Sequence, residues 1–266
     1  MTDRIKEAIA MESDDHPLGT WISIGHPTIA EASARLDLSF VLIDTEHTTM
    51  SLETVENMAR AVDAAPGETD TVVRVPWNDP VRLKRVIDIG VAGVMVPMIG
   101  SAEEARELVD ALRYPPDGVR GIAGSRAAGY GRNFEEYVTT ANGSILTIVQ
   151  IETEAGLANV EEIAEVEGID ALFVGPADLS GALGVFAEWN SEEFQYAVEK
   201  VIDAGQSANV PVGTLTVDID DIESTVEQGF DFLIAGKDTA QLMKSTEEAI
   251  NRYDNALKTA MSVTDP

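Results

Sequence analysis

The sequence predicts a (β/α)8 barrel, an α/β fold in which eight parallel strands alternate with helices. Three observations predict it. Short apolar runs alternate with amphipathic runs along the whole chain, eight such pairs fit within 266 residues, and no Pro/Gly-rich linker divides them. The apolar runs are nearly continuous in hydrophobic character, which is typical of parallel strands covered on both faces. We therefore expect one domain over residues 1–266, with a doubly wound open sheet as the alternative fold.

The expected strands are short runs rich in Val, Ile, Leu and Phe, bounded by polar residues, Gly or Pro. In chain order they lie at 19–23, 40–43, 71–75, 93–97, 146–151, 171–174, 210–215 and 230–235. Because each run is followed by a segment of a different periodicity, the pattern favours repeated β-α units over hairpins.

The expected helices carry apolar residues three and four positions apart, which places those residues on one helical face. They cover 28–36, 52–65, 80–89, 102–113, 157–167, 192–208, 221–228 and 240–260. Ser51, Ser101 and Ser191 stand where three of these helices begin, and we expect their hydroxyls to cap the first turns.

The segment 114–144 interrupts the alternation, and its Gly- and Arg-rich composition predicts a long loop. Long loops within compact domains are usually functional or form interfaces. Arg120, Arg126 and Arg132 could hold an anion there. The alternative, which we favour, is a loop that packs against a neighbouring subunit.

Composition excludes several classes of protein. The chain has 47 acidic residues against 18 basic ones, a net charge of −29, and no Cys. Such a surface repels nucleic acids and anionic membranes, while the lack of Cys excludes thiol catalysis and Cys-bound metals. Dispersed acids with few lysines are typical of proteins that live in high salt. No apolar run is long enough for a membrane span, and the N-terminus lacks the apolar stretch of a secretory signal, so we expect a cytoplasmic protein.

Polar residues stand where several of the expected strands end, which is the face that carries the active site in barrel enzymes. Asp44 and His47 follow the second strand, Arg74 lies near the end of the third, Glu152 follows the fifth and Asp178 the sixth. Glu152 and Asp178 follow neighbouring strands, and two carboxylates without Cys favour a hard divalent cation such as Mg²⁺. The alternative is that both are ordinary polar residues of the rim.

The other candidates have roles that depend on their neighbours. Asp44 could hold the ring of His47 in one tautomer and raise its basicity. Arg74 could stabilise an anion at the barrel mouth, or it could form a salt bridge with Asp44 or Glu152. Asp88 lies in the last turn of the 80–89 helix, on the face opposite the site, where a surface acid is the simpler interpretation.

Taken together, the motifs FVLIDTEH, VVRVPWNDP, VMVPMI, RYPPDGVRG, QIET and GPADLS, in this order, resemble the HpcH/HpaI class II aldolase family of pyruvate aldolases. The resemblance covers about residues 19–242. It implies a (β/α)8 barrel, a divalent metal ion (Mg²⁺, Mn²⁺ or Co²⁺) and a homohexamer built as a dimer of trimers. It also implies reversible cleavage of a 4-hydroxy-2-oxo acid, such as 4-hydroxy-2-oxo-heptane-1,7-dioate, to pyruvate and an aldehyde through a metal-bound enolate. The resemblance further implies a role in the catabolism of aromatic compounds.

The resemblance also implies a role for each matching residue. Glu152 and Asp178 match the metal ligands, His47 the catalytic base and Asp44 its partner. Asp88 matches an acid that reaches the histidine of a neighbouring subunit. Arg74 matches the residue that stabilises the enolate. The positions that match the substrate contacts are Arg74, Gln150, Ala177, Asp178 and Leu215.

Two departures from the family pattern lie at the ends of the last two strands. The seventh reads GTLTVD, and the eighth carries Lys237 where the family usually has an uncharged residue. Three alternatives stay open: a Schiff-base aldolase that uses Lys237, a C–C lyase of the citramalyl/citrate lyase type, and a non-catalytic barrel that binds oxo acids.

Overall fold

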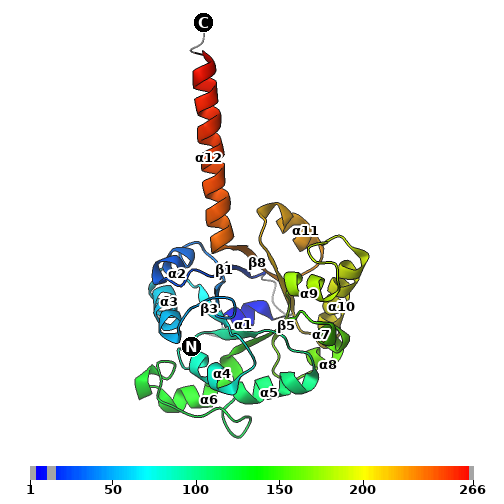
Figure 1. Ribbon diagram of the computed structural model, residues 1–266. Helices are drawn as coiled ribbons and strands as arrows, with labels where there is room; N and C mark the ends of the chain where they lie inside the picture. The colour runs from blue at the N-terminus through cyan, green and yellow to red at the C-terminus, as the bar shows by residue number, and fades with distance from the viewer. Residues whose placement is uncertain (1–3, 11–15, 264–266) are drawn as a thin grey trace.

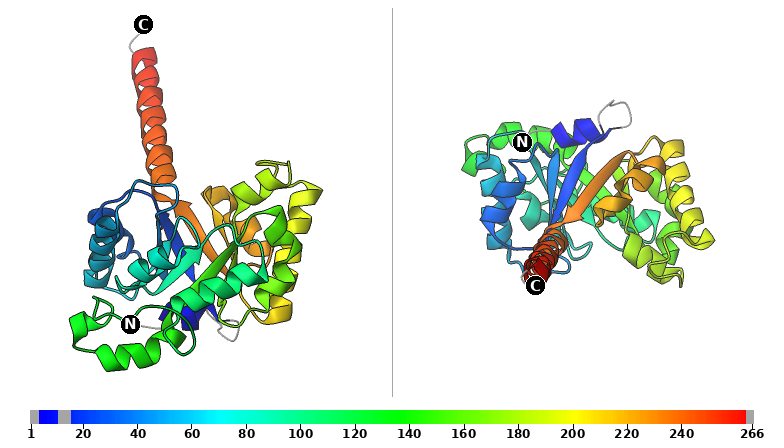
Figure 2. Two further views of the ribbon diagram at one scale, coloured as in Figure 1. Left: turned by 60° about the horizontal axis from the view of Figure 1, so that its bottom comes forward. Right: turned by 90° about the horizontal axis from the view of Figure 1, so that it is seen from above.

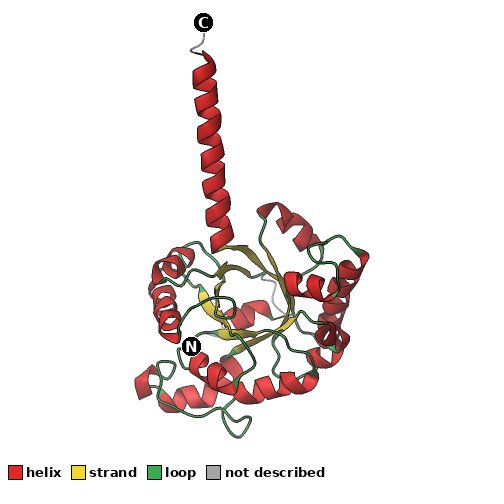
Figure 3. Ribbon diagram, in the orientation of Figure 1, coloured by secondary structure: helices red, strands yellow, loops and turns green. Residues whose placement is uncertain are grey.

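The computed structural model describes residues 4–10 and 16–263, and it shows a closed barrel of eight parallel strands arranged in sequence order. Figure 1 gives the view into the ring, and Figure 3 shows the strands inside a surrounding layer of helices. The (β/α)8 prediction is confirmed. The strands are β1 Leu18–Ile22, β2 Phe40–Asp44, β3 Asp70–Arg74, β4 Gly93–Val96, β5 Leu146–Ile151, β6 Ala171–Val174, β7 Val212–Thr216 and β8 Phe232–Lys237.

The helices follow the strands, and the three serine caps are confirmed. The hydroxyls of Ser51, Ser101 and Ser191 accept hydrogen bonds from backbone N–H groups in the first turns of α3, α5 and α10. The helices are α1 Arg4–Ile9, α2 Pro27–Ser33, α3 Leu52–Ala64, α4 Pro80–Ile87, α5 Ala102–Leu112, α6 Phe134–Ser144, α7 Glu154–Ala158, α8 Val160–Ala164, α9 Pro176–Ala182, α10 Glu192–Ala208, α11 Ile222–Glu227 and α12 Asp238–Val263, with 3-10 turns η1 Gly129–Gly131 and η2 Ile219–Asp221.

Two apolar clusters form because successive strand residues point to opposite faces. Inward residues such as Leu42, Ile148 and Phe173 fill the barrel, whereas outward residues pack against the helices. Ile5 and Ile9 of α1 join the inner cluster, so α1 closes the amino-terminal end of the barrel. In Figure 1 this helix is visible through the ring. The opposite end, at the carboxyl ends of the strands, is left for a site.

The segment 114–144 is not a continuous loop, because it contains η1 and α6. The sequence of α6 ends in Thr, Asn, Gly and Ser, which have modest helix propensity. Packing stabilises it instead, since Tyr137 and Ala141 are buried against Tyr114. Arg120 and Arg126 are not free for an anion, because they form ion pairs with Asp88 and Asp63, respectively.

Two other parts of the pattern differ from the prediction. The helix expected at 157–167 is divided into α7 and α8, which meet at Asn159. The short helices α1 and α9 were not predicted.

Helix α12 leaves the barrel and extends away from it, as Figures 1 and 2 show. It contacts β1 and β8 at its first turns. Its apolar residues Met243, Ile250 and Leu257 are 60%, 54% and 43% exposed. Within the described parts of the chain, no helix, α12 included, has both the length and the hydrophobicity needed to cross a membrane.

Candidate active site

A buried ion pair joins the carboxyl ends of β2 and β3 at the barrel mouth. Arg74 donates from Nε and Nη2 to the two carboxylate oxygens of Asp44, over 2.9 and 2.8 Å. Its Nη1 lies 2.7 Å from Oε2 of Glu46, and its guanidinium carbon lies 4.4 Å from the ring centre of Trp21. The salt-bridge alternative for Arg74 is therefore formed, with Glu46 rather than Glu152 as the second acid.

Asp44 is occupied by these contacts and does not hold His47. Burial alone would raise the pKa of Asp44, but the hydrogen bonds and charge of Arg74 hold that pKa below its ordinary value. The backbone N–H of Glu46 and the indole N–H of Trp21 also donate to Asp44, over 3.0 and 3.4 Å. Among the described residues, no hydrogen bond joins Asp44 to His47, because both oxygens of Asp44 already accept hydrogen bonds from other donors.

Glu152 is held by contacts from both sides at the end of β5. The side chain of Gln150 donates from Nε2 to Oε2 of Glu152 over 3.0 Å, and the backbone N–H of Met98 donates to Oε1 over 2.9 Å. Met98 has a left-handed backbone, with φ 59°, which is uncommon for a residue other than Gly. A Cβ atom on Gly175 would come 2.4 Å from Oε2 of Glu152. The backbone around this carboxylate is therefore shaped to leave room for it.

Negative charge is in excess at the mouth. Burial raises the pKa of Glu152 to about 7, and the charges of Asp178 and Glu46 contribute to the rise. Burial also raises the pKa of Glu46, which interacts with the charge of Asp178. Arg74 lowers the pKa of both glutamates, but its positive charge is already paired with Asp44. An additional cation would reduce the repulsion between these carboxylates.

The donor atoms suit a divalent cation. Asp178 lies in the first turn of α9, close enough to Glu152 for their charges to interact, and Oε1 of Gln150 is buried without a hydrogen-bond partner among the described residues. In the described chain, no group of three His, Asp or Glu side chains could hold a metal by itself. Mg²⁺, however, commonly takes one or two carboxylates and completes its shell with water and substrate oxygens. Glu152 and Asp178 fit such an ion.

His47 lies on the open side of the same mouth. Its side chain is 66% exposed, and its Nε2 lies 3.8 Å from Oε2 of Glu46. An accessible imidazole can take a proton from a bound substrate or from a water molecule. The acid beside His47 in this chain is therefore Glu46.

Asp88 lies at the other end of the barrel, because α4 runs back from the mouth and Asp88 is its C-terminal capping residue. Its Oδ1 accepts a 2.7 Å hydrogen bond from Nη2 of Arg120, and the guanidinium of Arg120 stacks on Tyr114 at 4.4 Å. Within the described residues of one chain, no contact links Asp88 to His47.

The remaining predicted substrate contacts occupy the rim. Ala177 precedes Asp178 in α9 and is exposed. Leu215 of β7 is partly buried and packs against the inner cluster, so its side chain lies on the inner side of the barrel wall. Lys237 is the last residue of β8 and is partly exposed.

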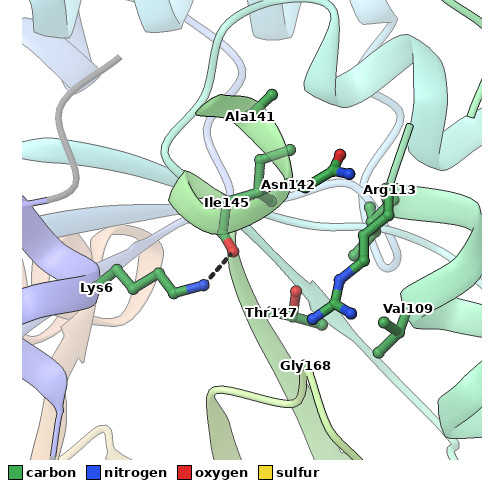
Figure 4. A pocket seen from close by; sticks show the side chains of 9 residues that line it. Lys6, Val109, Arg113, Ala141, Asn142, Ile145, Thr147 and Gly168 are labelled. Atoms are coloured by element: carbon green, nitrogen blue, oxygen red, sulfur yellow. Dashed lines mark hydrogen bonds between the residues drawn. The ribbon is translucent and has the colours of Figure 1, made fainter. Parts of the chain in front are cut away.

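Two cavities lie at the opposite, amino-terminal end of the strands. One of about 10 Å³ is shown in Figure 4, where Lys6 donates to the backbone oxygen of Ile145 over 3.2 Å. The other, of about 520 Å³, is lined by residues at the start of β3, including Asp70 and Thr71. Neither cavity contains the carboxylates of the mouth, and the chemistry of the side chains places the candidate active site at the mouth.

Sequence reasoning missed three residues of this site. Glu46 lies between two residues that were singled out, but a single acid among 47 carries no signal of its own. Met98 acts through its backbone N–H, which side-chain chemistry does not predict. Gly175 follows β6 directly, and a Gly at a strand end can mark the close approach of another group.

The chain matches the family model described as HpcH/HpaI aldolase/citrate lyase over residues 18–245. A protein from Paraburkholderia phytofirmans named hydroxypyruvate/pyruvate aldolase is 38% identical over 245 residues, which cover 90% of this chain and 94% of that protein. A protein from Shigella sonnei named 4-hydroxy-2-oxo-heptane-1,7-dioate aldolase is 35% identical over 246 residues, covering 92% and 93%. The crystal structure of an HpcH/HpaI aldolase/citrate lyase family protein from Burkholderia cenocepacia has a TM-score of 0.90, with 34% identity and coverage of 95% and 100%.

Proposed function

Because this chain belongs to the HpcH/HpaI aldolase/citrate lyase family, we propose that it is a divalent-metal-dependent class II aldolase. It cleaves a 4-hydroxy-2-oxo acid reversibly to pyruvate and an aldehyde. The observation that carries the proposal is the crowding of Glu46, Glu152 and Asp178 around one already paired arginine. The names of its relatives, which describe aldolases of 2-oxo acids, support the same reaction class.

Glu152 and Asp178 would hold the metal ion, which is Mg²⁺, Mn²⁺ or Co²⁺ in this proposal. When bound, the ion supplies a Lewis acid that stabilises negative charge on the oxygens of the 2-oxo acid. Met98 and Gln150 keep Glu152 in place through their hydrogen bonds.

Three groups would orient the 2-oxo acid, and a fourth residue would border the aldehyde half. Gln150 presents its unpartnered Oε1 from the inner wall, and the exposed backbone of Ala177 lies beside Asp178. Arg74 faces the negative charge that develops as the C–C bond breaks; its Nη1, now against Glu46, is the group that would turn to the substrate. Leu215 excludes water from the aldehyde side.

His47 would take the proton of the 4-hydroxyl group, since it is the exposed base of this mouth. Asp44 acts indirectly in one chain, because it fixes the position of Arg74. Asp88 of a neighbouring subunit would support the histidine, as the resemblance to the family implies. Catalysis then depends on assembly.

The proposed assembly is a homohexamer built as a dimer of trimers. Its support in this chain is α12, on which Met243, Ile250 and Leu257 recur every seven residues and are exposed. A seven-residue repeat forms a continuous stripe along one side of a helix, and such stripes pack against other helices. Light scattering after gel filtration should give a mass near six chains for the wild type, and a smaller assembly for Ile250→Asp combined with Leu257→Asp.

The proposed function is tested by measuring pyruvate release from a panel of 4-hydroxy-2-oxo acids, with Mg²⁺, with Mn²⁺ and after treatment with EDTA. We expect cleavage that EDTA abolishes and added metal restores. Cleavage that persists after complete metal removal would contradict the metal-dependent mechanism. Binding of pyruvate by calorimetry without cleavage of any member of the panel would instead indicate a binding protein.

A further inference from the structure

Lys237 faces the barrel mouth because of an irregularity in β8. At the start of the β1–β8 pairing, Leu18 lies opposite Leu233 and Gly19 opposite Ile234, whereas further along Trp21 lies opposite Lys237. One extra residue of β8 is therefore inserted between these pairs. Residues that are paired in a parallel sheet point to the same face, and Trp21 belongs to the inner cluster. The insertion turns Lys237 inward, although strict alternation would place it outward with Leu233.

Gly236 makes this insertion possible. Its φ is +81°, a left-handed backbone that glycine adopts readily and other residues rarely do. A Cβ atom there would also lie 2.1 Å from Nε2 of Gln241. Bulges of this kind are common at the rims of barrels next to active sites, where they redirect a side chain. The backbone of β8 is therefore adapted to the position of Lys237.

The ammonium group of Lys237 has no ion pair with a described residue, although the chain is strongly acidic. Its neighbour Asp238 does not serve, because that carboxylate accepts hydrogen bonds from the backbone N–H groups of Ser23, Ile24 and Thr239. Lys6, Lys200 and Lys244 each form an ion pair, whereas Lys84 and Lys258, like Lys237, form none with a described residue. Of these three lysines, Lys237 is the one at the carboxyl end of a strand, since Lys84 lies in α4 and Lys258 in α12. A partly buried cation without an internal partner, at the mouth of a candidate active site, is suited to bind an anion from outside.

Lys237 lies at a distance from the proposed metal ligands, and this distance determines which part of a bound substrate it can contact. Asp178 follows β6, and β8 is two strands further around the barrel. Neighbouring strands are about 4.8 Å apart, so the two positions are separated by roughly 10 Å along the wall. Leu215 of β7 lies between them. A substrate held at Glu152 and Asp178 by its 2-oxo acid end would therefore extend its other end toward Lys237.

We propose that Lys237 is a specificity-determining residue that binds a carboxylate at the far end of the aldehyde half of the substrate. The preferred substrate is then a 4-hydroxy-2-oxo dicarboxylic acid, and the preferred aldehyde carries a terminal carboxylate. This inference rests on the proposed function, since it assumes cleavage at the same site. Lys237 acts here as a charged binding group and forms no covalent bond with the substrate.

The test compares two aldehydes of equal length, succinate semialdehyde and butanal, as partners of pyruvate in the aldol direction with Mg²⁺. The enzymes are the wild type, Lys237→Met, Lys237→Arg, and Lys258→Met as a control that removes one exposed charge far along α12. We expect Lys237→Met to lower kcat/KM for succinate semialdehyde at least about 10-fold, as for the loss of one charge-assisted contact. The same change should leave kcat/KM for butanal within about threefold of the wild-type value. Lys237→Arg should retain most of the preference for succinate semialdehyde over butanal, and Lys258→Met should leave that preference unchanged.

Three results would overturn the inference while the proposed function stands. They are an equal loss for both aldehydes in Lys237→Met, no loss for either aldehyde, and covalent trapping of pyruvate on Lys237 by borohydride. If the wild-type enzyme joins pyruvate to neither aldehyde and releases it from no 4-hydroxy-2-oxo acid, the proposed function itself fails. The inference then fails with it.

Discussion

Buried carboxylates have different partners at the two ends of the barrel. At the amino-terminal end, Asp70 is paired with Arg4 and Asp170 with Lys6, over 3.0 Å in each case. Backbone N–H groups of Ile5 and Thr147 complete the contacts of these two acids. Each of these two acids therefore has its own cation and its own backbone donor.

At the carboxyl-terminal end, Arg74 forms ion pairs with Asp44 and Glu46, whereas Glu152 and Asp178 have no ion pair with an arginine or lysine among the described residues. The same chain thus balances its charges where α1 closes the barrel and leaves them unbalanced at the mouth. Buried charges are costly unless paired, so the excess of carboxylates at the mouth supports the proposed function, in which a metal ion would complete the site. We therefore expect loss of Asp70 or Asp170 to affect stability alone, and loss of the acids at the mouth to affect activity.

The largest expected effect is on activity, from Glu152→Gln. Losing one of the two proposed metal ligands should lower kcat/KM for pyruvate release about 10³-fold or more, since a bound metal contributes several kcal/mol to the transition state. The metal-free variant should nevertheless be as stable as the metal-free wild type, because one of the crowded charges is removed. Calorimetric melting in EDTA checks stability, and a variant that retains near-wild-type metal-dependent cleavage would refute the assignment.

The next effect is on stability, from Arg74→Met. This change leaves Asp44 buried without its partner, which should cost about 3–5 kcal/mol of unfolding free energy. The double variant with Asp44→Asn should recover part of that loss, because no unpaired charge remains. Urea unfolding of the three proteins measures both differences, and equal stability of the single and double variants would show that the pair does not act as a unit.

A smaller effect is expected from Lys6→Met, at the amino-terminal end of the barrel. This variant should lose about 1–2 kcal/mol of unfolding free energy near pH 7 and no activity. Burial raises the pKa of Asp170 in the folded chain, and Lys6 opposes that rise. An acid whose folded pKa is raised favours folding when protonated, and this contribution is lost as the pH rises through the folded pKa. Removing Lys6 raises that pKa further, so the cost of the variant should be greatest at pH 7–8 and shrink as the pH falls toward 4.

A measurement of activity is the control for the Lys6→Met variant. Lys6→Met should leave kcat unchanged under conditions where the protein is folded, because it lies at the end of the barrel away from the mouth. A loss of kcat comparable to that of Glu152→Gln would remove the distinction between the two ends.

The strands were the most predictable part of this molecule. Because both faces of a barrel strand are covered, runs such as FVLI and ALFV are apolar throughout, and all eight expected strands are present. Helix α6 was not predictable in the same way, because its stability comes from contacts of Tyr137 and Ala141 with residues distant in sequence. The carboxylates at the strand ends could be located from the sequence, since their positions follow from the strands.

Contacts between those side chains were less predictable. Asp44 and His47 are three residues apart, yet Asp44 pairs with Arg74 of the next strand, which is its neighbour in the sheet. The inward position of Lys237 depends on one inserted residue at Gly236, which a period of two along β8 does not reveal. The spacing of residues along the chain therefore identifies candidate site residues. Strand register and backbone irregularities determine which of their side chains come into contact.

The extended course of α12 has a thermodynamic consequence. In the proposed hexamer, another copy of the chain would cover its exposed apolar residues, so association would contribute part of the folding free energy of each subunit. Mass action then links melting temperature to protein concentration. A dilute solution should unfold at a lower temperature than a concentrated one, with the C-terminal helix losing amide protection before the barrel does.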